Sequence, residues 1–200
     1  MATLNASTKW LADGTPVTLR SAAVTDAEAT LALFRSIVEE GQYTLAEPAE
    51  LTQTLAAEQA AIAADQDAPS DLCLVATVDE QVVGMVRATA GSYRRTQHFA
   101  DIDSMWVAQS WRGRGVAHAL MKTLITWAEQ HEHLEKLGLF VFSSNRRAIR
   151  FYEKHGFIIE GRYARDMKLS DREYVDTIAM GQLIKPRCTS LAASMATAVD

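Results

Sequence analysis

The segment 112–117, RGRGVA, has the residue types and spacing of an anion-binding turn. Its two glycines let the backbone turn sharply and approach a ligand closely. The segment stands where a predicted strand gives way to a predicted helix, and the free N–H groups at a helix N-terminus attract phosphates. The spacing matches neither the GxGxxG pattern of dinucleotide-binding folds nor the GxxxxGK[ST] pattern of P-loops. Taken alone, the segment is either a pyrophosphate site with two cationic arginines or a tight turn with solvated arginines.

A second cluster, NRRAIRFYEKHGF at residues 145–157, carries a tyrosine on a short predicted helix. A phenol within hydrogen-bond reach of a leaving group can supply the proton that the departing charge needs. Taken alone, however, Tyr152 is better explained as a core aromatic residue on the helix face that also carries Ile149. The cluster by itself leaves both interpretations open.

Together the two clusters resemble the GCN5-related N-acetyltransferase (GNAT) family. The family's phosphate loop has the pattern Q/R-x-x-G-x-G/A, which Arg112-x-x-Gly115-x-Ala117 matches. Its second pattern is N-x-x-A-x-x-x-Y-x-x-x-G-F, and Asn145, Ala148, Tyr152, Gly156 and Phe157 match every fixed position. Asn145 follows Gly115 by 30 residues, the separation typical of the family. The resemblance covers roughly residues 16–184, and the end of the chain is similar to the branch that acetylates free amino acids and other small amines.

The resemblance implies acetyl-CoA as co-substrate and no metal. In the family, acetyl-CoA lies between the third long strand and the next one, its pantetheine arm pairing with the strand backbone and its pyrophosphate held by the glycine-rich turn. The matching cofactor-binding residues are Met105, Trp106, Val107, Arg112, Gly113, Arg114, Gly115, Val116, Ala117, Asn145, Ala148 and Tyr152. Asn145 would bond the pantetheine end, and Ala148 would be small because the cofactor passes over it. Tyr152 would be the general acid that protonates the CoA thiolate.

The resemblance implies that the general base lies on the strand that precedes the phosphate loop. Asp101 and Asp103 have the same parity on a strand predicted over 99–107, so both should project from one face with Met105 and Val107. Two close carboxylates raise each other's pKa and attract a cationic amine. Alternatively, they are solvated strand residues or form salt bridges with Arg94 or Arg95, and many family members have no assigned base.

The acceptor site should be completed by the loop between the first two helices. Its candidate substrate-binding residues are Glu39, Glu40, Tyr43 and Glu47. Three carboxylates there favour a cationic acceptor, although Glu39 and Glu40 could equally be an exposed helix end.

The elements that must position these residues follow from the apolar periodicity. Strands are predicted over 16–20, 72–78, 81–88, 99–107, 136–142, 157–159 and 174–183, and helices over 25–41, 48–64, 116–131 and 146–155. Thr25 and Glu28 match a capping box at the start of the first helix. The expected fold is one α/β (α+β) domain, with a mixed, mostly antiparallel sheet of about seven strands flanked by about four helices. We expect a flexible arm at 1–14, the N-acetyltransferase domain at 15–184 and a flexible tail at 185–200.

Composition narrows the class of protein. The 200 residues are 48% apolar and 22% charged, which excludes disordered and collagen-like chains. A net charge of −5 argues against a nucleic-acid binder, and no apolar run is long enough to span a membrane. Cys73 and Cys188 suggest neither a disulfide framework nor a metal site, and Cys73 should be a buried, inert thiol. With no signal peptide, the cytoplasm is the expected compartment.

The expected function is transfer of an acetyl group from acetyl-CoA to a primary amine of a small molecule, such as an amino acid, directly in a ternary complex. No cysteine is placed to form an acetyl-enzyme. One alternative is acetylation of a protein N-terminus or lysine, and another is a non-catalytic acetyl-CoA-binding module. A homodimer is also considered, because many family members form dimers. The acceptor itself is not determined by the sequence.

Overall fold

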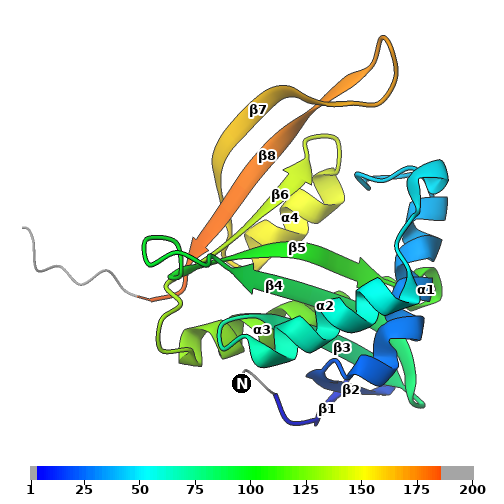
Figure 1. Cartoon of the computed structure of the whole chain (residues 1–200), viewed down its shortest axis with the longest axis vertical. Coiled ribbons are helices and arrows are strands. Elements are labelled where there is room, and N and C mark those ends of the chain that lie inside the picture. The colour runs from blue at the N-terminus through cyan, green and yellow to red at the C-terminus, as the bar shows by residue number, and fades with distance from the viewer. Residues whose placement is uncertain (1–3, 186–200) are drawn as a thin grey trace, which may run out of the picture.

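The computed structural model describes residues 4–185, in which an eight-stranded sheet carries helices on both faces (Figure 1). The strands are β1 (Ser7–Trp10), β2 (Pro16–Ser21), β3 (Leu72–Val78), β4 (Gln81–Ala90), β5 (Phe99–Val107), β6 (Lys136–Phe142), β7 (Ile158–Lys168) and β8 (Tyr174–Leu183). The helices are α1 (Ala27–Glu39), α2 (Leu55–Asp67), α3 (Val116–Gln130) and α4 (Arg146–Lys154). The strand order is β1-β2-β3-β4-β5-β6-β8-β7, and of these neighbours only β5 and β6 are parallel. The expected mixed, mostly antiparallel fold is confirmed, with one strand more than predicted.

Two apolar cores form because β3 and β4 are buried on both faces. Leu72 and Leu74 face a large cluster built with α3 and α4, whereas Cys73 and Val75 face a smaller cluster built with α1 and α2. This arrangement explains why β3 reads as one continuous apolar run. Burial raises the pKa of Cys73 to about 12, which confirms the prediction of a buried, inert thiol.

The parallel strands β5 and β6 pair only at their beginnings. Their register runs from Phe99–Lys136 to Asp101–Gly138, after which the two strands diverge, as Figure 1 shows. Gly138 is required at the last pair, because a Cβ there would lie 2.4 Å from the Phe99 ring. From residue 102 onward, the β5 edge that faces β6 has no strand partner among residues 4–185. The divergence leaves room for a ligand between two strands of one sheet.

A β-bulge in β5 overturns the simple alternation predicted for this strand. Arg87 is paired with Ser104, but the next residue of β4, Ala88, is paired with Ile102, so Asp103 is the extra residue. Beyond the bulge the side chains exchange faces, because an inserted residue shifts the period of two. Met105 consequently packs on the α3 side with Ile102, whereas Trp106 packs on the α1 side. The prediction that Asp101, Asp103, Met105 and Val107 share one face is therefore wrong for the last two.

The first 14 residues do not all form the loose arm that was expected. Residues 7–10 form β1, paired antiparallel with β2, and Leu11 is only 7% exposed. The strand has no buried face, so its sequence shows no apolar alternation. Of the predicted tail at 185–200, all but Lys185 lies outside the described residues.

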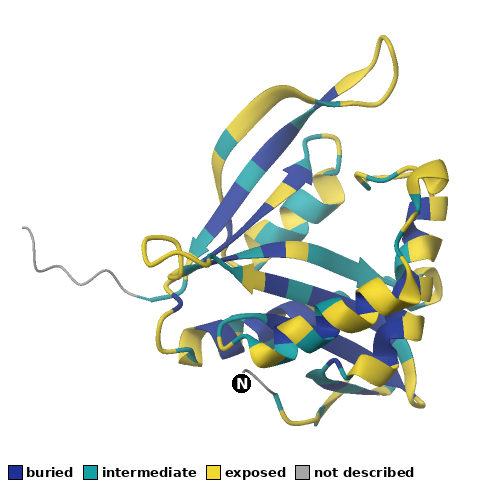
Figure 2. Ribbon diagram, viewed as in Figure 1, coloured by how far each residue is buried: buried dark blue, intermediate teal, exposed yellow. Residues whose placement is uncertain are grey.

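Three boundaries of helices and strands also differ from prediction. Thr25 and Glu28 do not form the predicted capping box: Asp26 occupies the N-cap position of α1, and its carboxylate accepts a hydrogen bond from Ala23 N–H at 2.7 Å, which caps the preceding 3-10 turn (Val24–Asp26). Helix α2 begins after Thr54, whose Oγ1 accepts from Ala57 N–H at 3.1 Å, and Pro48 only opens a short 3-10 turn. Strand β7 extends to Lys168, well beyond the predicted end at residue 159. It has no buried face, so no apolar alternation in the sequence marks its full length (Figure 2).

Other local predictions are confirmed. The β3–β4 turn uses Asp79 and Glu80, both at positive φ, and Gly156 follows α4 at φ 89°. Within residues 4–185, the structure contains no helix with the length and hydrophobicity needed to span a membrane.

Gly84 offers a test of how tightly the sheet and α3 are packed. A Cβ at Gly84 would lie 3.0 Å from the Trp106 carbonyl oxygen and 3.2 Å from the side chains of Val116 and Leu120. We expect Gly84→Val to lower the free energy of unfolding by about 1–3 kcal/mol through overpacking, as measured by urea denaturation. Gly161→Val, in strand β7 with open space around it, is the matched control and should change stability by less than about 0.5 kcal/mol. Equal losses in the two variants would contradict the packing described.

Candidate active site

A single cavity of about 2110 Å³ extends through the gap between β5 and β6. Most of the predicted site residues line it, namely Glu40, Tyr43, Asp101, Asp103, Met105, Trp106, Val107, Arg112, Gly113, Arg114, Gly115, Ala117, Asn145, Ala148 and Tyr152. Segments far apart in the sequence, from the end of α1 to the start of α4, therefore meet at one site.

Three predicted site residues have side chains outside the cavity lining. Glu39 is exposed at the end of α1, and Glu47 stands where the Pro48–Glu50 turn begins, with its N–H donating to Glu50 Oε2 at 3.0 Å. Their placement does not support the predicted role in substrate binding. Val116 is 1% exposed, so its side chain belongs to the core and only its backbone could contact a cofactor.

The glycine-rich turn has the backbone geometry of an anion cradle at the start of α3. Gly113 and Gly115 adopt φ values of 77° and 104°, which favour glycine because other residues are strained there. Helix α3 makes its first backbone bond from Ala119 N–H to Gly115 C=O, at 3.0 Å. The N–H groups just before Ala119 lie in the first turn, where an α-helix leaves donors unpaired and its dipole is positive. This geometry suits a pyrophosphate.

Both arginines of this turn are held by the chain itself. Arg112 donates to Val107 C=O at 2.9 Å and forms a bidentate pair with Glu40, at 2.7 and 2.6 Å. Arg114 donates to Asp13 at 2.8 Å and lies 4.0 Å from the centre of the Trp111 ring. As placed, the two side chains brace the turn, which leaves the backbone N–H groups as the donors available to an anion. The predicted contribution of their guanidinium groups as phosphate donors is not supported by this arrangement.

Asn145 and Tyr152 lie on α4, facing the same cavity. Asn145 Oδ1 accepts from Ala148 N–H at 3.1 Å and so caps the helix, which leaves its amide nitrogen as a donor for a ligand. The Tyr152 ring packs edge-on against Phe151 and Phe157, with centroids 5.3 and 5.8 Å away. Burial raises the pKa of Tyr152 to about 12. The phenol therefore keeps its proton at neutral pH, as a general acid must.

The two candidate bases lie together on the α2 side of the sheet. Asp101 is paired in register with Thr89, and Thr89 Oγ1 donates to Asp103 Oδ2 at 3.0 Å. Burial, and then the charge of Asp103, raise the pKa of Asp101, whose buried Oδ1 has no partner among residues 4–185. In the same part of the chain, neither Arg94 nor Arg95 forms an ion pair with them.

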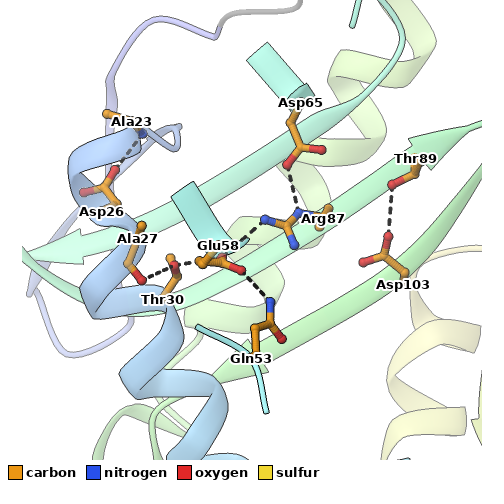
Figure 3. Close-up of polar contacts among 10 residues, drawn as sticks. All are labelled: Ala23, Asp26, Ala27, Thr30, Gln53, Glu58, Asp65, Arg87, Thr89 and Asp103. Atoms are coloured by element: carbon orange, nitrogen blue, oxygen red, sulfur yellow. Dashed lines mark hydrogen bonds and ion pairs between the residues drawn. The ribbon is translucent and has the colours of Figure 1, made fainter. Parts of the chain in front are cut away.

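Sequence reasoning missed a buried charged network beneath this site (Figure 3). Arg87 Nε donates to Asp65 at 2.8 Å, and its Nη2 lies 3.3 Å from Glu58. Glu58 also accepts from Thr30 at 2.9 Å and from Gln53 at 3.0 Å. A signal did exist, because Arg87 is a charged residue inside an otherwise apolar strand and must have buried partners.

The network leaves the cavity floor with an excess of negative charge. Burial opposes the charge of Arg87, but Cys73, Asp65 and Glu58 together outweigh it and raise the pKa of the guanidinium. Burial raises the pKa of Asp65 to about 6 in spite of Arg87. Glu58, Asp101 and Asp103 line the cavity together with Arg87, and Asp65 lies behind Arg87 outside the lining, so this part of the cavity wall carries more negative than positive charge, which attracts an ammonium group.

Aromatic side chains line the same cavity where α1 and the loop after it meet the two diverging strands. Phe34 of α1 stacks on Trp106 of β5 with centroids 4.7 Å apart. Tyr43, at a φ of 57° in the loop after α1, meets Phe142 at the end of β6 edge-on, at 6.5 Å. These pairs connect the helical layer to both diverging strands.

A sheet that divides beside a phosphate cradle, with a protonated tyrosine and carboxylates on either side of the gap, defines an acyl-CoA-dependent transferase acting on an amine. The model of the acetyltransferase (GNAT) family matches residues 38–157 of the chain. The chain therefore belongs to the GNAT family and is an acetyl-CoA-dependent N-acetyltransferase.

The relatives agree with this assignment. The chain is 36% identical over 117 residues to the L-amino acid N-acetyltransferase AaaT of Escherichia coli (strain K12), covering 58% of this chain and 71% of the relative. It superposes on an acetyltransferase of the GNAT family from Streptococcus pneumoniae with a TM-score of 0.79 and 25% identity, over 84% and 99% of the two chains. The fold is also shared with YncA from Salmonella typhimurium, solved with its cofactor acetyl-CoA, at a TM-score of 0.76 and 18% identity, over 88% and 98%.

The buried Asp65 predicts a measurable pH dependence of stability. Its pKa is about 6 in the folded protein, against an ordinary value of 3.8, so the folded state binds more protons between these values and Asp65 destabilises it as pH rises. Asp65→Asn keeps the acceptor for Arg87 without the charge. Relative to the unchanged protein, its free energy of unfolding should increase by roughly 1–3 kcal/mol between pH 4 and 6. Urea denaturation across this range tests it, with the exposed Asp67→Asn as control, and a difference that does not vary with pH would contradict it.

Proposed function

We propose that the chain transfers the acetyl group of acetyl-CoA to the primary amine of a small molecule, directly within a ternary complex. The observation that carries the proposal is the single cavity that joins the phosphate cradle, Tyr152 and the paired aspartates. The unpaired β5 edge supports an added strand-like ligand, as expected for the pantetheine arm along residues 105–107. The Val107 carbonyl is already occupied by Arg112, so that pairing would rest on the groups before it.

The proposed reaction needs only groups that line the cavity. Asp101, assisted by Asp103, takes a proton from the substrate ammonium, directly or through water. The freed nitrogen lone pair forms a C–N bond at the thioester carbonyl, and the tetrahedral intermediate collapses by breaking the C–S bond. Tyr152 donates its phenolic proton to the departing sulfur. The attacking nitrogen loses its second proton as the intermediate collapses, and this proton returns through water to the Tyr152 phenolate. The products are an N-acetyl amine and CoA, and solvent takes the proton from Asp101.

The acceptor class is proposed from charge and from the relative. The acidic floor favours an ammonium substrate, and the E. coli relative is an L-amino acid N-acetyltransferase, so free amino acids and similar small amines are the first candidates. Tyr43 and Glu40 remain proposed acceptor-side residues, although Glu40 is already paired with Arg112. A protein N-terminus or lysine is the alternative acceptor, and a non-catalytic acetyl-CoA-binding module is the second alternative. Absence of a metal, a homodimer and a cytoplasmic location remain predictions.

Release of CoA from acetyl-CoA against a panel of amines tests the function. The panel should contain free amino acids, polyamines, aminoglycosides and short peptides. With the accepted amine, Tyr152→Phe should lower kcat at least about tenfold, because general acids typically contribute more than this. Tyr163→Phe is the matched control, since Tyr163 is an exposed tyrosine outside the cavity. Acetyl-CoA binding without CoA release from any amine would favour the binding module, and acetylation of peptides alone would favour the protein acceptor.

The proposed base predicts a shift in the pH profile. The charge of Asp103 helps to raise the pKa of Asp101, so Asp103→Asn should lower that pKa and move the acid limb of kcat/KM to lower pH. Asp101→Asn should remove the limb and most of the activity. Asp79→Asn, in the exposed β3–β4 turn, is the control and should leave the profile unchanged. An unchanged limb in Asp103→Asn, or full activity in Asp101→Asn, would contradict this assignment.

A further inference from the structure

The turn between β1 and β2 is a rigid, self-bonded unit. Leu11 N–H donates to Thr15 C=O at 2.9 Å, Gly14 N–H donates to Leu11 C=O at 2.9 Å, and Thr15 N–H donates to Asp13 Oδ1 at 3.0 Å. Gly14 adopts a φ of 79°, which closes the turn. The sequence offers no chemical motif in this segment, and the proposed reaction does not use it.

This turn contacts the glycine-rich phosphate turn through three different interactions. Asp13 Oδ2 accepts from Arg114 Nε at 2.8 Å, and Thr15 Oγ1 accepts from Arg114 Nη2 at 3.0 Å. Leu11 reaches within 3.7 Å of where a Cβ on Gly115 would be. The face of the Arg114 guanidinium also stacks on Trp111. With acceptors at two edges and an aromatic ring on its face, Arg114 has one defined position.

The contacts matter because the phosphate turn carries little stiffness of its own. Gly113 has no atom within 4 Å of where a Cβ would be, and glycine loses more conformational freedom than other residues when it is ordered. When a loop is already ordered in its binding geometry, less of the ligand's interaction energy is needed to order it, so the affinity is higher. The Thr15 backbone and hydroxyl, and then Arg114, lower the pKa of Asp13 to about 2, so its carboxylate is charged at every working pH.

We propose that the Asp13–Thr15 turn is a clamp that holds the phosphate turn in its binding geometry. Asp13 and Thr15 are positioning residues, and they act through Arg114, the residue of the phosphate turn to which both of them bond. The inference rests on the proposed binding of acetyl-CoA at that turn. In this arrangement Arg114 acts as a structural brace, and its charge is neutralised by Asp13 before the cofactor arrives. The clamp acts on the turn proposed to bind the pyrophosphate, and it includes none of the groups proposed to react, Asp101, Asp103 and Tyr152.

The test compares Asp13→Asn with the unchanged protein. Asparagine retains an acceptor for Thr15 N–H but loses the charge that holds Arg114. We expect the Kd of acetyl-CoA, by titration calorimetry, and its KM to rise roughly five- to tenfold, with kcat and the amine KM within about twofold. For S-acetylpantetheine, which has no pyrophosphate, kcat/KM should not change. Asp171→Asn, which breaks an exposed ion pair with Lys168 at the β7–β8 turn, is the matched control and should alter none of these values.

A double-mutant cycle with Arg114→Gln distinguishes a structural role of Arg114 from direct binding of phosphate by Arg114. If Arg114 is held as a brace, the double variant should bind acetyl-CoA about as weakly as either single variant. Tighter binding in Asp13→Asn would mean that Arg114 is released to bind phosphate, and unchanged binding would mean that the turn has no effect; either result overturns the clamp. Equal losses with S-acetylpantetheine would also overturn it, since they would indicate general damage. If the unchanged protein binds no acetyl-CoA at all, the proposed function fails, which is a separate outcome.

Discussion

The divergence of β5 from β6 is the constraint on which the rest of the structure depends. Parallel strands normally stay paired, because an unpaired backbone edge loses hydrogen bonds. Here the pairing ends at Asp101 and Gly138, and the Phe99 ring occupies the space that a side chain at Gly138 would need. The N-terminal ends of α3 and α4 lie beside the opening with their donors unpaired or singly capped. The sheet thus leaves unsatisfied backbone groups where a ligand with its own amides and phosphates can satisfy them.

The second organising feature is a surplus of buried carboxylates. Burying a charge is costly unless it is paired, and Arg87 provides the pairing for Glu58 and Asp65 from the centre of β4. One guanidinium cannot neutralise Glu58 and Asp65 and also the two aspartates of β5, Asp101 and Asp103. Burial, with a smaller contribution from neighbouring carboxylates, raises the pKa values of Asp65 and Asp101, and the surplus gives this side of the cavity a negative field. The excess of buried carboxylates lowers the stability of the folded protein, but it gives the cavity a charge that suits an ammonium group. The proposed phosphate site depends on helix N-termini.

Much of the fold could be predicted because its central elements have regular periodicity. The bounds of β5 and β6 agree with those expected from their apolar patterns, and the two motif clusters open α3 and α4 as predicted. What could not be predicted lacks a buried face or a local signal. Strands β1 and β7 are exposed on both sides, so no alternation marks them. The bulge at Asp103 depends on the partner strand, and it reversed the face predicted for Met105 and Val107.

By itself, the sequence determined the family, the phosphate turn, the acid candidate Tyr152 and the pair of aspartates, because each depends on residue types at short, fixed spacings. Only the tertiary structure decided what the charged side chains do. Glu40 and Arg112, 72 residues apart, hold each other, and Asp13 holds Arg114 from 101 residues away. Glu58 and Arg87 meet beneath the acceptor cavity. The partner of a long charged side chain is chosen by the folding of distant segments into one place, and no local pattern in the sequence records that choice.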